Sequence, residues 1–143
     1  MDPDGPVVRR LGPADVELVL TAAGLFDEHP RRDWTERFLT RDGHHLFLAH
    51  LDGRPVGFVT GIEITHPDKG TEMLLYELGV DEASRRQGIG RALVHALLDL
   101  SRTLGCVGMW VPIEPDNPAA VATYRSAGAD DPEPASVMTW TIG

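Results

Sequence analysis

Apolar and polar positions along the chain repeat with two periods, one typical of helices and one typical of strands. In residues 88–104 the apolar positions recur about every 3.6 residues, which predicts a long amphipathic helix that Gly105 ends. These positions are Ile89, Leu93, Ala96, Leu97, Leu100 and Leu104. Two apolar runs, residues 45–51 and 55–64, flank the dipeptide Asp52-Gly53. Asp-Gly between such runs predicts an antiparallel hairpin.

The same two periods predict further strands and helices in the rest of the chain. Further strands are predicted over residues 7–11, 73–80, 107–111 and 136–142, and further helices over residues 13–24, 34–40 and 118–127. No repeat, low-complexity tract or Pro/Ser-rich linker divides the chain. We therefore expect one domain over residues 1–143, of the α/β class, with a mixed sheet flanked by helices.

Composition is that of a globular protein with its own core. The chain has 143 residues, of which 42% are hydrophobic and 24% charged. No apolar run approaches the roughly 20 residues that span a bilayer. Arg9-Arg10 is a twin arginine, but the segment that follows it is too polar for a signal core. We expect a cytoplasmic protein that does not bind membranes.

Charge and cysteine content argue against several kinds of partner and site. Thirteen basic and 22 acidic side chains give a net charge of -9, which repels phosphate backbones, so nucleic acid is not expected as a partner. The one cysteine, Cys106, allows no intramolecular disulfide, and the six histidines show no metal-ligand spacing, so no metal is expected. Cys106 has no identifiable activating base beside it, and we expect a small buried strand residue rather than a nucleophile.

A basic, glycine-containing segment precedes the long predicted helix. It reads Arg85-Arg86-Gln87-Gly88-Ile89-Gly90-Arg91. The two glycines would let a diphosphate approach the N–H groups at the helix start, where the helix dipole and the arginines favour negative charge. Leu93 stands where a dinucleotide fingerprint has its third glycine, so that motif is excluded. A solvated basic turn is the alternative interpretation.

With a second motif, this segment resembles the GNAT N-acetyltransferase superfamily over nearly the whole chain. The superfamily's pyrophosphate loop, Arg/Gln-x-x-Gly-x-Gly/Ala, is matched by Arg85, Gly88 and Gly90. Its pattern Asn-x-x-Ala-x-x-x-Tyr-x-x-x-Gly is matched by Asn117, Ala120, Tyr124 and Gly128. The resemblance implies a GNAT acyl-CoA N-acyltransferase fold, acetyl-CoA as cosubstrate, and a possible homodimer.

The same resemblance implies a splayed central sheet. The strand at residues 74–80 would diverge from the strand at residues 107–111, and Pro112, which lacks an N–H, would mark the end of their pairing.

A closer similarity is to the type I aminoglycoside 3-N-acetyltransferases within that superfamily. It is carried by Tyr76-Glu77-Leu78-Gly79-Val80, Arg85-Arg86-Gln87-Gly88-Ile89, Asp116-Asn117-Pro118-Ala119 and Val137-Met138. That family usually has Asp at position 77, Ala at positions 79 and 90, and an acidic residue at position 141, where this chain has Glu, Gly, Gly and Thr. The similarity implies acetylation of the 3-amino group of an aminoglycoside.

Two motif residues would handle protons. Glu77 interrupts an apolar strand and is expected on the face opposite Leu74, Tyr76 and Leu78. The resemblance implies that it accepts the proton of the substrate ammonium, directly or through water, because an alkyl ammonium of pKa about 10.4 cannot attack a thioester. Tyr124 would donate a proton to the departing CoA sulfur. The alternatives are a structural hydrogen-bond acceptor at Glu77 and a core aromatic residue at Tyr124.

Further residues are assigned to the two ligands. The expected acetyl-CoA contacts are Leu78, Gly79, Val80, Arg85, Arg86, Gln87, Gly88, Ile89, Gly90, Arg91 and Asn117. Asn117 is alternatively only a helix N-cap. The acidic residues expected around the amine are Asp27, Glu28, Glu63, Asp68, Glu72, Glu114 and Asp116, with an ordinary solvated surface as the alternative.

These features together predict an acetyl-CoA-dependent N-acetyltransferase for a small polycationic amine. A GNAT enzyme for another amine, such as a polyamine, an amino acid or a protein N-terminus, is the second hypothesis. A non-catalytic acyl-CoA sensor is the third.

Overall fold

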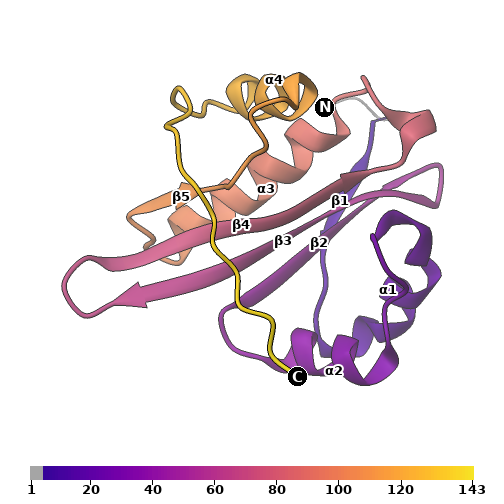
Figure 1. The fold of residues 1–143 in the computed structure, drawn as a ribbon. Coiled ribbons are helices and arrows are strands. Elements are labelled where there is room, and N and C mark those ends of the chain that lie inside the picture. Colours follow the sequence, from indigo (N-terminus) through magenta and orange to yellow (C-terminus); the bar gives the residue numbers. More distant parts are fainter. Residues whose placement is uncertain (1–4) are drawn as a thin grey trace.

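The computed structural model describes residues 5–143, which form a five-stranded sheet between two layers of helices (Figure 1). The strands lie side by side in chain order: β1 (Val7–Arg10), β2 (His44–Leu51), β3 (Arg54–His66), β4 (Gly70–Val80) and β5 (Gly108–Trp110). The first four are antiparallel, and β5 is parallel to β4. This mixed sheet confirms the predicted fold class; the first four residues of the predicted domain lie outside the described part.

Helices cover both faces of the sheet. One face carries α1 (Val16–Thr21) and α2 (Arg32–Thr40), and the other carries α3 (Ile89–Thr103) and α4 (Pro118–Ser126). Short 3-10 turns flank these helices: η1 (Pro13–Asp15), η2 (Ala23–Leu25) and η3 (Glu82–Ser84). None of the helices in residues 5–143 has the length and apolar character needed to cross a membrane.

The hairpin between β2 and β3 confirms the prediction from Asp52-Gly53. Both residues have positive φ, 52° and 75°, as a two-residue type I′ turn requires. The strands pair from Leu51 and Arg54 to His44 and Ile62. The hairpin supplies two neighbouring strands of the sheet, and α3 packs on the face of both.

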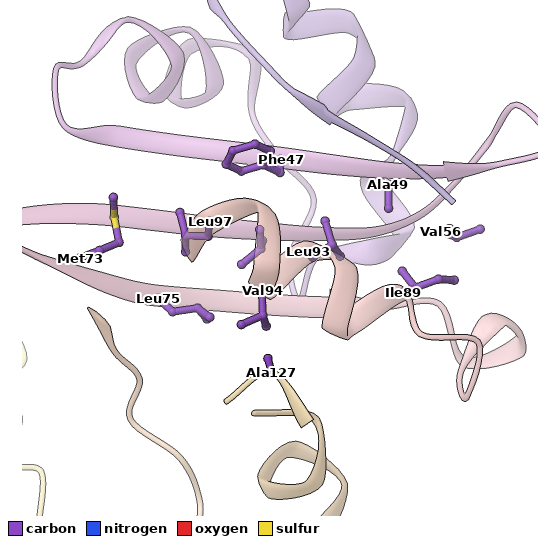
Figure 2. Packing of buried hydrophobic residues seen from close by; sticks show 11 residues of the cluster. Phe47, Ala49, Val56, Met73, Leu75, Ile89, Leu93, Val94, Leu97 and Ala127 are labelled. Carbon is purple, nitrogen blue, oxygen red and sulfur yellow. The ribbon is translucent and has the colours of Figure 1, made fainter. Parts of the chain in front are cut away.

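The larger core cluster lies between α3 and the sheet (Figure 2). Ile89, Leu93 and Leu97 project from α3 onto Met73 and Leu75 of β4, and all five side chains are at most 1% exposed. The predicted amphipathic helix is therefore confirmed. One predicted member of its apolar face, Leu104, is 41% exposed, because the helix has already ended where Gly105 takes a φ of 78°.

The predicted last strand over residues 136–142 is wrong. This segment is extended but pairs with no strand among residues 5–143, and Val137, Met138, Trp140 and Ile142 are 79–92% exposed. Its alternating pattern is that of a strand, but a strand also needs a neighbouring backbone to satisfy its N–H and C=O groups. Pro132 and Pro134 fix their own φ angles and favour extended conformations for the residues just before them.

Candidate active site

The central sheet splays at the end of β5. Pairing between β4 and β5 covers only three residue pairs and ends where Leu74 meets Trp110. Beyond that point, Leu75 and residues 77–80 of β4 pair with β3 on one side, and this stretch pairs with no strand on the other side within the described chain. The predicted divergence is thus confirmed, and Pro112 follows the end of β5 by two residues. The opening leaves backbone N–H and C=O groups of β4 free to bind an extended ligand.

The predicted anion-binding segment forms a turn at the start of α3. Arg86 has a φ of 65°, and Gly88, with a φ of 78°, is the N-cap of the helix. The first helical hydrogen bond joins the N–H of Ala92 to the carbonyl oxygen of Gly88 at 3.0 Å. No backbone acceptor within residues 5–143 takes the N–H groups of residues 86–91. These groups can therefore hold an anion at the positive end of the helix dipole.

Space and charge around this turn also suit a diphosphate. A Cβ added at Gly88 would meet no atom within 4 Å, so a ligand can reach the backbone there. Arg85, Arg86 and Arg91 are exposed beside it. Gly90 has a packing role instead, because a Cβ at this position would lie only 3.1 Å from Thr123 Cγ2 of α4. It lets α4 pack closely against the start of α3.

Helix α4 positions the second motif. The side chain of Asn117 caps the helix by accepting the N–H of Ala120 at 3.1 Å, which confirms the capping interpretation and leaves its amide NH₂ as a donor. Tyr124, in the last turn of α4, packs against the cluster under α3. Burial raises the pKa of its phenol above the ordinary value, so Tyr124 keeps its proton and can donate it.

A β-bulge in β4 sets the direction of Glu77. Leu75 pairs with Gly61 and Glu77 pairs with Thr60, so Tyr76 is an extra residue in β4. The bulge re-aims every later side chain. Leu74 and Glu77 therefore share a face, and the prediction that they lie on opposite faces is wrong, although Glu77 does lie opposite Leu78.

The face reached by Glu77 is the one that carries α1 and α2. A Cβ added at Gly79, two residues along the strand, would lie 2.9 Å from the carbonyl oxygen of Leu25 in η2. Glu77 is half-buried there, and loss of solvent raises the pKa of its carboxyl, with a further contribution from the negative charge of Asp27. A carboxylate with a raised pKa is a stronger base toward an ammonium proton.

Two aromatic rings hold the loop that carries Asp27, and nothing in the sequence pattern indicated them. Phe26 stacks on Phe58 of β3 with ring centroids 4.1 Å apart. The absence of a side chain at position 79 lets this loop lie directly on β4. The aminoglycoside 3-N-acetyltransferases usually have Ala at position 79, and this chain has Gly. That difference was the one sequence feature that could have indicated a close approach of another segment to β4.

The other predicted acidic residues are dispersed. Glu63 binds His45 at 2.8 Å, and it lies on the α3 face because Gly61, two residues earlier, packs against Leu97. Glu72 lies 3.5 Å from His66 at the far end of β4, about 15 Å along the strand from Glu77. The other four are exposed: Glu28 follows Asp27, Asp68 pairs with Lys69, and Glu114 and Asp116 precede α4. The structure thus brings Asp27 to Glu77 and leaves Glu63 on the opposite face.

The described residues also show how possible metal ligands and the Cys106 thiol are placed. No three His, Cys, Asp or Glu side chains within residues 5–143 gather closely enough to hold a metal ion. Burial raises the pKa of the Cys106 thiol, and the charge of Glu63 raises it further, so the reactive thiolate is disfavoured.

The close approach at Gly79 leads to a first prediction. Gly79→Ala should destabilise the protein by about 1–3 kcal/mol, because its Cβ would lie 2.6 Å from Phe58 Cε1 and 2.9 Å from the Leu25 carbonyl oxygen. Urea unfolding measures this change. Gly24→Ala, where no atom lies within 4 Å, is the matched control and should be neutral or slightly stabilising. Equal stability of the two variants would contradict the packing described here.

Comparison with known proteins decides the family. Residues 16–129 match the model of the Acetyltransferase (GNAT) family. The chain belongs to the GNAT family. This match includes the α3 turn, Glu77 and Tyr124.

Individual relatives of this GNAT chain differ in their named substrates. Mycothiol acetyltransferase of Nocardia farcinica (strain IFM 10152) is 37% identical over 88% of the chain, which spans 46% of that protein. An aminoglycoside acetyltransferase from an uncultured soil metagenomic sample, solved with sisomicin, is 21% identical and covers 96% of this chain and 97% of its own with a TM-score of 0.88. Aminoglycoside N-acetyltransferase AAC(6')-Iy, solved with CoA, is 20% identical, covers 99% and 100%, and has a TM-score of 0.78. At these identities the two structures establish the shared fold.

Proposed function

We propose that this GNAT protein transfers an acetyl group from acetyl-CoA to a primary amine of a small polycationic molecule, with aminoglycosides as the first substrate class. The observation that carries the proposal is Glu77, a half-buried carboxylate of raised pKa beside Asp27, next to the free edge of β4. The anion-binding turn at the start of α3 follows the same strand in the chain. A thioester donor and an amine acceptor could meet at that edge.

Several residues are suited to hold acetyl-CoA. The free N–H groups of residues 86–91, with the side chains of Arg85, Arg86 and Arg91, would bind its diphosphate. Leu78, Gly79 and Val80 offer backbone groups on the free side of β4 for its amide arm, and the Asn117 NH₂ is a further donor. The cosubstrate supplies an activated acyl group and a thiol leaving group.

The chain's own residues would move two protons. Glu77 accepts a proton from the substrate ammonium, directly or through one water molecule, and so frees the nitrogen lone pair. Tyr124, on the α3 side of the sheet, holds its proton at neutral pH and donates it to the leaving sulfur. The backbone N–H groups near Val80 would polarise the thioester carbonyl.

A second candidate is acetylation of another amine by the same chemistry. It is favoured by the relative at 37% identity, which is named for mycothiol, whereas the aminoglycoside acetyltransferases are 20–21% identical. Within the aminoglycoside class, the sequence resemblance implies the 3-amino group, while one structural relative carries a 6' designation. The position acetylated would separate these two subclasses.

Thiol release from acetyl-CoA with a panel of amines tests the proposal. Gentamicin and sisomicin should be turned over faster than spermidine, free amino acids or a peptide, and product NMR should locate the acetyl group on the 3-amino nitrogen. Turnover of a monoamine or peptide alone would retain the GNAT chemistry and overturn the substrate. Tight acetyl-CoA binding without any turnover would instead support the sensor hypothesis.

Salt dependence provides a second prediction. A protein of net charge -9 should attract a molecule with several ammonium groups over distances that physiological salt screens at about 8 Å. For an aminoglycoside, kcat/KM should fall several-fold as the salt concentration rises from low to physiological, whereas a singly charged amine should respond weakly. Steady-state kinetics measure both. An equal response of the two amines would contradict electrostatic steering.

A further inference from the structure

Thr60, in the middle of β3, carries a buried polar group that finds no partner in the fold. Its side chain is 2% exposed, and its Oγ1 makes no hydrogen bond to any group of residues 5–143. A buried hydroxyl in this state destabilises a protein, because it has lost its hydrogen bonds to water and gained none in return. Valine would fill nearly the same space without this penalty. The hydroxyl therefore points to a role other than packing.

The sheet places one polar side chain beside Thr60, and it is the candidate base. Thr60 pairs with Leu46 of β2 on one side and with Glu77 of β4 on the other. Along β3, its neighbours on the same face are Phe58 and Ile62. Of these four side chains, only that of Glu77 can take part in a hydrogen bond.

The hydroxyl of Thr60 and the carboxyl of Glu77 are close enough to interact. Both side chains lie on the face that carries α1 and α2, where Phe58, two residues before Thr60, belongs to the core cluster. Side chains directly opposite each other on antiparallel strands have Cβ atoms about 4.5–5.5 Å apart. Burial and the charge of Asp27 act on the Glu77 carboxyl, and no side chain of residues 5–143 donates a hydrogen bond to it. A donor and an acceptor without other partners thus face each other across the two strands.

We propose that Thr60 positions Glu77 by donating a hydrogen bond from its hydroxyl to the ionised carboxylate, directly or through one water molecule. The inference rests on the proposed function, in which Glu77 accepts the proton of the substrate ammonium. A donor beside the carboxylate favours its charged form and so opposes the effects of burial and of Asp27. Because Thr60 is β-branched, its hydroxyl is held in few orientations. Thr60 is too buried to touch a substrate, so it acts through Glu77 as a positioning residue.

Titration of the Glu77 carboxyl in the free protein tests the hydrogen bond without any turnover. Its ¹³C chemical shift is followed against pH in the wild type, Thr60→Val and Thr60→Ser. Thr60→Val keeps the shape of the side chain but removes the donor, and it should raise the pKa of Glu77 by about one unit, a tenfold change in ionisation. Thr60→Ser keeps the hydroxyl and should titrate like the wild type. Asp27 is unchanged in all three proteins, so its charge does not contribute to the difference. An unchanged pKa in Thr60→Val, or an equal rise in both variants, would overturn the proposal.

Kinetics connect this hydrogen bond to catalysis. With an amine that is turned over, Thr60→Val should move the rise of kcat/KM to higher pH by the same amount as the carboxyl titration. Thr35→Val is the matched control, because Thr35 is also buried, at 7% exposed, but lies on α2, and its pH profile should equal that of the wild type. Turnover by Thr60→Val with an unshifted profile would overturn the positioning role alone. Absence of turnover by the wild type with every amine would overturn the proposed function and the positioning role with it.

Discussion

Gly88→Glu should raise the Kd for acetyl-CoA by more than 100-fold, to the point where calorimetry detects no binding. The substitution places a side chain and a negative charge where the free N–H groups of residues 86–91 and the arginines would hold the diphosphate. A carboxylate there competes for the same donors and repels the anion. The φ of 78° at Gly88 adds backbone strain, but the fold should persist because the added Cβ would meet no atom of residues 5–143 within 4 Å.

The chain provides a closely matched control at the other end of the same helix. Gly105 has the same φ of 78° as Gly88 and equally open surroundings, so Gly105→Glu imposes the same backbone strain far from the turn. Its acetyl-CoA affinity should equal that of the wild type. If both folded variants bind acetyl-CoA equally well, residues 85–91 do not bind the diphosphate.

Glu77→Gln should lower kcat/KM at neutral pH by about 10²–10⁴-fold, the usual contribution of a general base. In the wild type, kcat/KM should rise with pH as the carboxyl ionises, at a pH above the ordinary range for glutamate because its pKa is raised. The variant should lose this rise and recover partly at high pH, where more amine is already free. Rates measured over pH 5–9 separate these cases.

Two further measurements distinguish a base from a structural carboxylate. Glu72→Gln changes another β4 carboxylate on the same face, about 15 Å away, and should leave the pH profile unchanged. The raised pKa also means that stability falls as pH rises through the folded-state value. Glu77→Gln should therefore have a higher Tm than wild type at about pH 8, and the difference should vanish near pH 4. Wild-type turnover by Glu77→Gln at every pH would assign the residue a structural role.

The sequence predicted those elements whose ends are marked by local chemistry. Asp52-Gly53 located the hairpin, and Gly88 and Gly105 bounded α3, because in each case backbone conformation at one or two residues decides the structure. The turn before α3 also forms at Gly88, where the sequence predicted the helix start. These features depend on neighbours in the chain, which a sequence displays directly.

What the sequence did not predict depends on partners distant in the chain. The bulge at Tyr76 arises from pairing with β3, and alternation alone therefore placed Leu74 on the wrong face. Glu63 was grouped with Glu77 although the sheet separates them, since no local signal shows which face a charged position takes. The last strand has the right alternation but no partner strand within residues 5–143.

The bulge at Tyr76 also divides β4 into two parts whose side chains are aimed separately. Before the bulge, residues 72–74 pair with β5, and Met73 and Leu75 fill the core under α3. After it, residues 77–80 carry the candidate base and the edge that β5 leaves free. The extra residue interrupts the alternation of side chains between the two faces of the sheet. The face taken by a side chain after the bulge therefore does not follow from the alternation before it. The direction of Glu77 is therefore set at the bulge, and the residues that pair with β5 can be substituted without re-aiming the candidate base.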